Sequence, residues 1–218
     1  MELSFWRSKW KKGQTGFHSP IVNPNLKKFW PEFSVKNKGT VLVPLCGKSL
    51  DMLWLRDMGY KIIGVEISEI ACHDFFEENK LSYQKRSFAS FSIFEGNNIS
   101  IWQGDFFKLV SSYIPKLVGI YDRAALVALP EPKRLQYSKK ILALSSDFTH
   151  IFLHTFEYPD NEMKGPPFSV SEKEIHVLYG KNFQIERLKS VDILSNNEKF
   201  QKRGLSELME KIYHLHAE

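Results

Sequence analysis

The residues best suited to ligand chemistry surround one turn, between positions 41 and 51. The string reads as a short buried strand, a tight turn on Gly47 and the first turn of an amphipathic helix. Such a unit places a loop and a helix N-terminus at the carboxyl edge of a sheet, where open α/β sheets bind nucleotide-like ligands. Lys48 and Ser49 are similar to the end of a phosphate-binding loop, but that motif needs a glycine five positions before Gly47, where the chain has Leu42. The turn therefore predicts a nucleotide-like ligand and excludes an NTPase.

An acidic residue, Glu66, follows Gly47 by 19 positions, at the end of the next predicted strand. An acid there can accept hydrogen bonds from both hydroxyls of a ribose, although it could also be a plain surface acid. Only one of the three glycines of the dinucleotide fingerprint is present. These observations favour a nucleoside over a dinucleotide.

Asp105 and Phe106 follow Gly104, where a third strand should end at the same edge. A carboxylate or a backbone amide at this place can read the edge of an adenine, and Phe106 could cover the ring. The alternative interpretation is an ordinary turn.

Arg123 and two tryptophans could complete a ligand site. Arg123 lies in an apolar run, where an arginine is normally paired. Asp122 alone could satisfy it, or it could grip a carboxylate of the ligand. Trp6 and Trp10 are four positions apart and would share a helix face, usually a core arrangement, although an indole face also attracts a sulfonium cation.

The elements that must position these residues alternate as β-α-β-α-β-(α)-β-α-β-α-β, which predicts a mostly parallel sheet with helices on both faces. The predicted strands cover about residues 40–45, 61–65, 98–102, 116–121, 149–156 and 183–191. Residues 81–96 could form a hairpin or an irregular insertion. Apolar spacing alone predicts a helix over 205–215.

Composition limits the class of protein. A chain of 218 residues with 43% hydrophobic residues is most economically one domain. It has no apolar stretch that predicts a membrane span, no signal peptide, no metal-ligand cluster, and two cysteines that suit a reduced cytoplasm. The net charge is +5, but the basic residues occur as short pairs beside apolar residues, which is typical of solvated surface. We therefore expect a cytoplasmic protein that binds neither nucleic acid nor membrane.

Six strings occur in order over about residues 5–215. They are Trp6-x-x-x-Trp10, Gly16-Phe17-His18, the string from Val43 to Asp51, Gly64-Val65-Glu66-Ile67-Ser68, the string from Tyr121 to Pro130, and Gly165-Pro166-Pro167-Phe168. Together they resemble the thiopurine S-methyltransferase family, and most closely its bacterial branch. The Pro-Leu-Cys-Gly-Lys-Ser and Asp-Arg-Ala-Ala-Leu-Val strings are specific to this family among methyltransferases.

The resemblance implies a Rossmann-like class I methyltransferase fold. In that fold a seven-stranded, mostly parallel sheet has an antiparallel last strand and helices on both faces. The resemblance therefore replaces the helix over 205–215 by a strand. It also implies a single domain, 1–218, in which residues 1–38 are a helical cover for the cofactor and the acceptor.

The resemblance also implies the residues of the site. S-adenosylmethionine would be contacted by Trp10, Leu45, Glu66 and Arg123, with Trp6, Gly47, Asp105 and Phe106 as further contacts. Arg123 is the candidate catalytic residue, since a positive group beside the acceptor would favour a thiolate. Phe17 and the Pro166-Pro167 loop would close the acceptor pocket. No metal is implied.

The implied reaction is methyl transfer from S-adenosylmethionine to the sulfur of aromatic or heterocyclic thiols, such as thiopurines, by a monomer, leaving S-adenosylhomocysteine. Relatives also methylate small thiols, halides or oxyanions of selenium and tellurium, so these acceptors stay open. An RNA-binding protein or RNA methyltransferase is a third reading, although the chain lacks an Asn-Pro-Pro-Tyr-like motif. The last alternative is a non-catalytic protein that keeps the same fold.

Overall fold

A computed structural model describes residues 3–33 and 38–217 of the chain, so residues 1–2 and 34–37 of the predicted N-terminal cover lie outside the described residues. The chain divides into two compact units, with the division between Tyr121 and Asp122. Each unit is described by itself below. No helix within the described ranges is long and apolar enough to cross a membrane.

The first unit is built on four parallel strands in the order β5, β2, β1, β6. Their bounds are β1 (Thr40–Pro44), β2 (Lys61–Glu66), β5 (Ile99–Gln103) and β6 (Leu117–Arg123), whose last two residues belong to the second unit. Buried residues run along β1 without alternation, as expected for a strand covered on both faces. The four predicted strands of this unit are confirmed to within two residues at each end.

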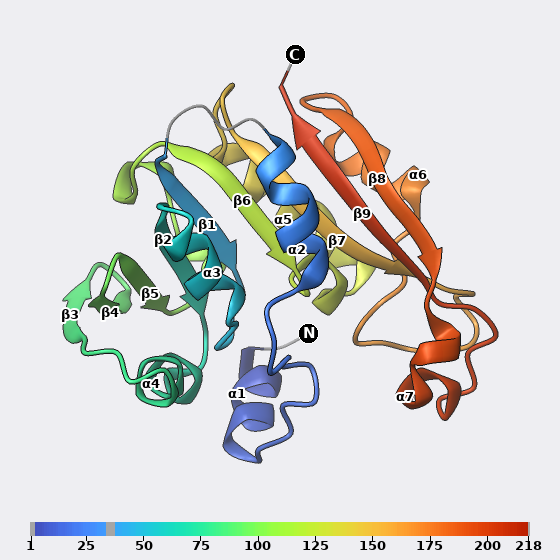
Figure 1. Cartoon of the computed structure of the whole chain (residues 1–218), viewed down its shortest axis with the longest axis horizontal. Helices are drawn as coiled ribbons and strands as arrows, with labels where there is room; N and C mark the ends of the chain where they lie inside the picture. The colour runs from blue at the N-terminus through green and yellow to red at the C-terminus, as the bar shows by residue number, and fades with distance from the viewer. Residues whose placement is uncertain (1–2, 34–37, 218) are drawn as a thin grey trace. The chain divides into compact units, whose positions relative to one another are not determined.

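The helices of the first unit follow local signals in the sequence. They are α1 (Leu3–Lys11), α2 (Pro24–Phe29), α3 (Asp51–Asp57) and α4 (Glu69–Glu78). Ser68 caps α4, because its hydroxyl accepts a hydrogen bond from the Ala71 amide at 3.4 Å. Gly59 ends α3 with a φ of 92°, which favours glycine. Helix α1 lies beyond the carboxyl ends of β1 and β2 (Figure 1).

A β-hairpin occupies the ambiguous stretch at residues 81–96. It pairs β3 (Gln84–Phe88) with β4 (Phe91–Gly96), and β4 continues antiparallel onto β5. The hairpin interpretation is confirmed, and it adds two strands to the seven that the family resemblance implied. The side chains of β3 are exposed along its length, whereas Phe91, Ile93 and Phe94 of β4 are buried.

The second unit pairs three strands in the order β7, β9, β8, all antiparallel. Their bounds are β7 (His150–Glu157), β8 (Gln184–Asp192) and β9 (Met209–His216), and the helices are α5 (Glu131–Leu144), α6 (Glu172–Tyr179) and the short α7 (Glu198–Gln201). The antiparallel last strand is confirmed. The helix that apolar spacing predicted over 205–215 is wrong.

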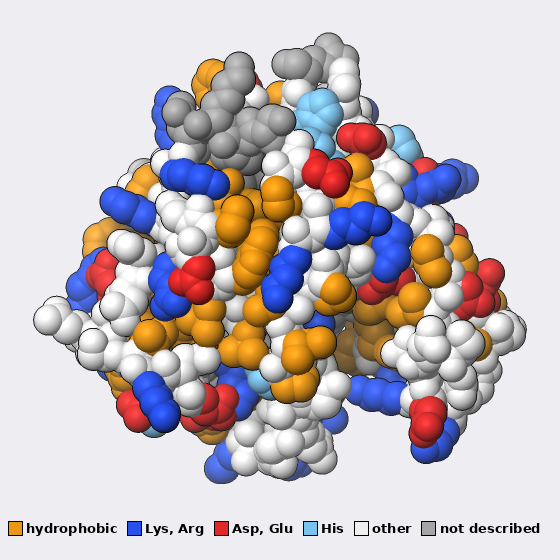
Figure 2. Space-filling model, in the orientation of Figure 1, with side chains coloured by type: hydrophobic (Ala, Val, Ile, Leu, Met, Phe, Trp, Pro, Cys, Tyr) orange, Lys and Arg blue, Asp and Glu red, His pale blue; other side chains and the backbone are white. Residues whose placement is uncertain are grey.

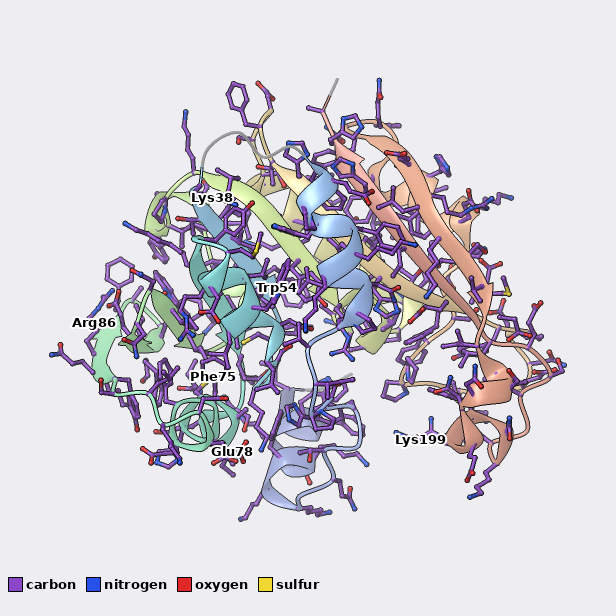
Figure 3. All side chains as sticks on the ribbon, viewed as in Figure 1. Lys38, Trp54, Phe75, Glu78, Arg86 and Lys199 are labelled. Atoms are coloured by element: carbon purple, nitrogen blue, oxygen red, sulfur yellow. The ribbon has the colours of Figure 1, made fainter. Side chains whose placement is uncertain are left out.

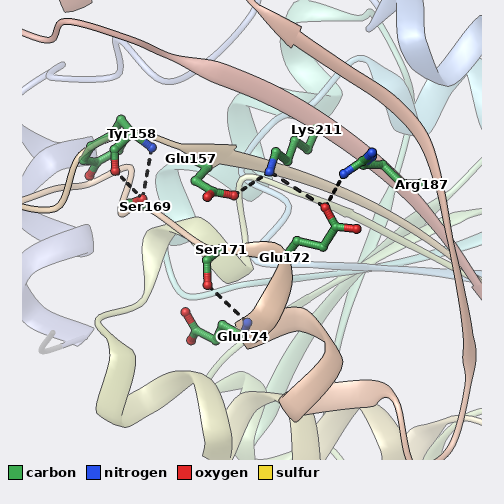
Figure 4. A network of polar contacts seen from close by, with 8 residues as sticks. All are labelled: Glu157, Tyr158, Ser169, Ser171, Glu172, Glu174, Arg187 and Lys211. Carbon is green, nitrogen blue, oxygen red and sulfur yellow. Dashed lines mark hydrogen bonds and ion pairs between the residues drawn. The ribbon is translucent and has the colours of Figure 1, made fainter.

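Ion pairs join the start of α6 to the sheet of the second unit (Figure 4). The Lys211 ammonium on β9 lies 2.6 Å from the Glu157 carboxylate on β7 and 4.0 Å from that of Glu172 on α6. Glu172 also pairs with Arg187 on β8. Ser171 caps the same helix start, where the Glu174 amide donates to the Ser171 hydroxyl at 3.2 Å. These contacts set the direction in which α6 leaves the preceding loop.

Candidate cofactor site

The turn between β1 and α3 has an unusual backbone. Leu45 has a φ of 48° and Gly47 a φ of 53°, and the left-handed region costs a residue with a side chain about 1–2 kcal/mol. A Cβ atom on Gly47 would lie 3.1 Å from the ring of Trp10, so glycine is favoured there for space as well. The Cys46 amide donates to the Val65 carbonyl at 3.0 Å. The turn is thus held against the end of β2.

The Glu66 carboxylate is fixed by that turn. The Gly47 amide donates to its Oε2 and the Ser68 amide to its Oε1, each at 2.8 Å. The residue is buried, which raises the pKa of its carboxyl, while the backbone amides of Ser68, Gly47 and Ile67 lower it. A carboxylate has about four acceptor sites. Beside these backbone donors the carboxylate keeps acceptor capacity for a hydroxyl of a ligand.

The end of β5 meets the same edge. The Gly104 amide donates to the Glu66 carbonyl at 2.8 Å, and the Gln103 side-chain amide donates to the Ile67 carbonyl at 3.1 Å. Asp105 also acts as a turn cap, since its Oδ1 accepts from the Phe107 amide at 3.0 Å. Asp105 therefore has the turn role of the alternative interpretation. This hydrogen bond uses Oδ1 and leaves Oδ2 for other donors.

A cavity of about 500 Å³ opens beside Asp105, within the usual size range of ligand pockets. It is lined from α1, the β3–β4 turn and the end of β5, including Arg7, Ile67, Ser90, Asp105 and Lys108. Phe106 does not line it: its side chain is buried and packs against Phe107, with ring centroids 5.9 Å apart.

Asp105 is the one residue of this lining that the sequence predicted as a site residue, and Ile67, Arg7 and Lys108 are among those that it missed. Ile67 could have been found, because the residue directly after a strand-end acid lies at the same edge. No sequence pattern indicated that Arg7 and Lys108 would line this cavity.

The aromatic residues of the N-terminal segment pack together over the turn. Phe17 makes edge-to-face contacts with Trp6 and Trp10, at centroid distances of 5.4 and 5.5 Å. Trp10 is buried and, as noted, lies against Gly47. The tryptophans thus pack as a cluster, and Trp10 also lies against the turn. Core packing and an indole face beside a ligand are therefore compatible interpretations.

Lys48 points to helix α4. Its ammonium lies 2.5 Å from the Glu78 carboxylate and 3.9 Å from that of Asp74, and its side chain is only 14% exposed. Figure 3 labels Glu78 and Phe75 on this helix, and Phe75 is buried. The pairing gives Lys48 a structural role and agrees with the rejection of a phosphate-binding loop.

Arg123 ends β6 and belongs to the second unit, so its surroundings are described there. The neighbouring Asp122 is buried and accepts from the Tyr137 hydroxyl at 2.7 Å and the Leu126 amide at 3.1 Å. Both of its oxygens thus serve groups other than Arg123. Burial raises the pKa of Asp122 to about 6, although these hydrogen bonds oppose the shift.

The predicted acceptor loop is tied to the segment after Arg123. The Phe168 amide, next to the Pro166-Pro167 pair, donates to the Val127 carbonyl at 2.7 Å. The Arg123 guanidinium also lowers the pKa of His154 on β7, after the larger effect of burial. Arg123 therefore lies within electrostatic reach of His154 on β7.

Among residues 3–33 and 38–217, no group of three histidine, cysteine or acidic side chains could hold a metal ion. The candidate cofactor site is built from Glu66, the turn from Leu45 to Gly47 and the end of β5, all in the first unit. Arg123 and the proline loop lie in the second unit. Trp6, Trp10, Gly47 and Glu66 are linked by contacts at the turn, Asp105 lines the cavity at the end of β5, and Phe106 is buried.

Comparison with solved structures identifies the fold. A Burkholderia thailandensis 1,6-didemethyltoxoflavin-N1-methyltransferase, solved with bound 1,6-didemethyltoxoflavin and S-adenosylhomocysteine, matches with a TM-score of 0.63 at 14% identity, over 98% of this chain and 87% of that one. A SAM-dependent methyltransferase from Anabaena variabilis also matches with a TM-score of 0.63, at 13% identity, over 99% and 95%. The chain thus has the Rossmann-like class I methyltransferase fold.

Comparison of sequences identifies the family. The family model described as Thiopurine S-methyltransferase (TPMT) matches residues 1–218. The chain is 41% identical over 213 residues to a thiopurine S-methyltransferase of Nitrosospira multiformis, covering 98% of this chain and 97% of the relative. It is 42% identical over 205 residues to one from Marinobacter nauticus, covering 94% of each. The chain belongs to the thiopurine S-methyltransferase family.

Proposed function

We propose that this protein transfers a methyl group from S-adenosylmethionine to the sulfur of aromatic or heterocyclic thiols, with thiopurine-type acceptors first. The observation that carries the proposal is the Glu66 carboxylate. Its two oxygens are fixed by the Gly47 and Ser68 amides at 2.8 Å, and the carboxylate keeps acceptor capacity for a ligand hydroxyl. A nucleoside ligand needs this arrangement at the edge of the sheet, and family membership specifies which nucleoside.

The residues present fit this cofactor. Glu66 would take the ribose hydroxyls, the turn from Leu45 to Gly47 would lie along the amino-acid portion and the sugar, and Asp105 with the adjoining cavity would take the adenine. The indole of Trp10, packed on Gly47, suits a sulfonium cation. When bound, S-adenosylmethionine supplies the electrophilic methyl group.

The protein contributes position and exclusion of water. It must hold the acceptor sulfur in line with the methyl–sulfonium bond at near-attack distance. An aromatic thiol ionises readily, so no strong general base is needed. Arg123 would favour the thiolate and is the proposed catalytic residue. Phe17 and the Pro166-Pro167 loop would close the acceptor pocket.

The chain as a whole would act as one methyltransferase domain, 1–218, with residues 1–38 as the cover. It would work as a cytoplasmic monomer on a small-molecule acceptor. Two buried, unbridged cysteines support a reducing compartment. On the face in Figure 2, lysine and arginine side chains are scattered among acidic and apolar ones, which does not favour a nucleic-acid partner.

An acceptor panel tests the proposal. Labelled S-adenosylmethionine is offered with a thiopurine, an aromatic thiol, a small aliphatic thiol, iodide, selenite, tellurite and RNA. The proposal expects the highest kcat/KM with the thiopurine or the aromatic thiol. Preferential labelling of the small thiol, a halide or a metalloid oxyanion would keep the fold and the cofactor but replace the acceptor. Labelling of RNA alone would overturn the proposal.

A further inference from the structure

A buried carboxylate just after the cofactor turn has no part in the proposed cofactor contacts. Asp51 is the first residue of α3 and is 1% exposed. Its Oδ1 accepts from the Asn23 amide at 2.7 Å, and its Oδ2 accepts from the Tyr121 hydroxyl at 2.8 Å. Burying a carboxylate is costly unless hydrogen bonds compensate it. Both donors come from segments distant in sequence, so this carboxylate joins parts of the first unit that are far apart along the chain.

The three residues form a closed ring. The Asn23 side-chain amide donates to the Tyr121 hydroxyl at 3.2 Å, and that hydroxyl donates onward to Asp51. Asn23 and Tyr121 are also buried, with exposed fractions of 3% and 1%. Hydrogen bonds to a charged group in a dry surrounding are stronger than those on the surface. The ring is therefore a firm junction.

Asn23 has a particular place in the N-terminal segment. After Trp10, every residue from 11 to 22 is exposed or half-buried, and Asn23 is the first buried one. It also begins α2, where its side chain accepts from the Asn25 amide at 2.9 Å. The segment that carries Trp6, Trp10 and Phe17 is thus followed by a connection that is fixed to the fold at Asn23.

Asp51 fixes that connection next to the cofactor turn. Two residues before Asp51, the Ser49 hydroxyl accepts from the Asp51 amide at 3.3 Å, so the carboxylate follows directly on the turn that begins at Leu45. We propose that Asp51 is a positioning residue, which attaches the N-terminal segment through Asn23 so that Trp10 stays packed on Gly47 when the cofactor binds. The effect on cofactor binding rests on the proposed function, whereas the attachment of the N-terminal segment does not.

Two substitutions break hydrogen bonds of the ring while leaving the side chain almost the same shape. They are Asp51→Asn and Tyr121→Phe. Tyr137→Phe is the matched control, because it removes a hydroxyl from another buried carboxylate, Asp122, in the second unit. The first readout is the rate of tryptic cleavage after Lys9, Lys11 and Lys12 in the protein without ligand. The second is the affinity for S-adenosylhomocysteine by calorimetry, and circular dichroism and the Tm report on the overall fold.

We expect cleavage about tenfold faster in Asp51→Asn, and smaller but measurable acceleration in Tyr121→Phe, because hydrogen bonds to a charged group are lost. The dissociation constant of S-adenosylhomocysteine should rise in parallel. Tyr137→Phe should lower the Tm without either effect. If Asp51→Asn does not fold, Tyr121→Phe decides by the same readouts.

The inference is overturned if the ring variants are cleaved at the rate of the unmodified protein, or if Tyr137→Phe is accelerated equally. The cleavage readout needs no cofactor. A protein that binds no S-adenosylhomocysteine at all but still shows the cleavage difference would therefore contradict the proposed function and leave the anchoring role of Asp51 supported.

Discussion

At the scale of single residues, the candidate site depends on how one carboxylate is held. Glu66 receives one amide from the turn and one from the start of α4, so its orientation is set before any ligand arrives. Preorganised acceptors of this kind cost little to use when a hydroxyl donor binds. Residues in the same turn that look more reactive, such as Lys48, have structural partners instead.

The substitution Glu66→Gln should weaken binding of S-adenosylhomocysteine by about ten- to a hundredfold, since hydrogen bonds to a charged acceptor contribute about 1.5–3 kcal/mol. One side-chain oxygen would become an amide group that faces a backbone donor or a ribose hydroxyl. Calorimetric titration measures the change, with Glu78→Gln as the control on α4. An unchanged affinity would remove Glu66 from the ribose.

The substitution Lys48→Met should leave that affinity within about twofold, because the ammonium serves Glu78 and Asp74 on α4 and a partly exposed ion pair contributes about 0–1 kcal/mol. Fluorescence titration with S-adenosylhomocysteine is a sufficient measurement. A large loss of affinity would show that Lys48 reaches the ligand after all.

The substitution Arg123→Lys should lower kcat with a thiol acceptor about tenfold or more, while affinity for S-adenosylhomocysteine is at least partly retained. Lysine keeps the charge but lacks the planar fork of the guanidinium. Single-turnover rates and calorimetry separate the two effects. Normal turnover in this variant would rule out Arg123 as the group that favours the thiolate.

Most site residues could be predicted from the sequence, but not all of their surroundings. Gly47 and Glu66 could be found because a turn glycine and a strand-end acid have positions fixed by strand spacing. Arg7 and Lys108 could not, because they reach the cavity only once α1 and the segment after β5 are folded against it. The ring of Asn23, Asp51 and Tyr121 spans 98 positions from Asn23 to Tyr121 and leaves no local pattern.

At the scale of elements, the last strand shows why periodicity failed. Leu205 and Leu208 pack with Tyr158 in a separate cluster before β9 begins. Within β9, the residues from Lys211 to Leu215 are all buried, so buried and exposed positions do not alternate along the strand. Two unrelated groups of apolar residues thus combined into helical spacing. By contrast, Ser68, Gly59 and Ser171 are local signals, and each lies at the end of a helix in the structure.

The junction of β6 with α5 should give the protein a measurable pH dependence. In the folded protein the pKa of Asp122 is raised from 3.8 to about 6 by burial. The folded form therefore binds the proton of Asp122 more tightly than the unfolded form does. This proton binding stabilises the fold fully below pH 4, and the stabilisation is lost as the pH rises through about 6. The shift corresponds to about 3 kcal/mol.

Urea denaturation from pH 4 to pH 7 tests this effect in Asp122→Asn, which cannot titrate. Relative to this variant, the unmodified protein should lose stability across that range, by up to about 3 kcal/mol. Histidines of the second unit, such as His214 with a pKa lowered to about 3, act in the opposite direction in both proteins and so cancel in the comparison. Parallel curves for the two proteins would contradict the assignment.

At the scale of the whole molecule, the fold and the family were predictable because the matching strings run through the chain in order. The hairpin β3–β4 was only one of two options, since exposed β3 has no alternation that distinguishes a strand from a loop. The acceptor is the part that sequence and fold specify least. The proline loop, which would meet the acceptor together with Arg123, is held by contacts such as that of Phe168 with Val127.

The most direct test of the account is product analysis after incubating the protein with S-adenosylmethionine and a thiopurine. Mass spectrometry should find the S-methylated thiopurine and S-adenosylhomocysteine in equal amounts, and Glu66→Gln should give far less of both at the same cofactor concentration. Absence of the S-methyl product, or its undiminished formation by Glu66→Gln, would contradict the central claim that this turn holds the methyl donor for a thiol acceptor.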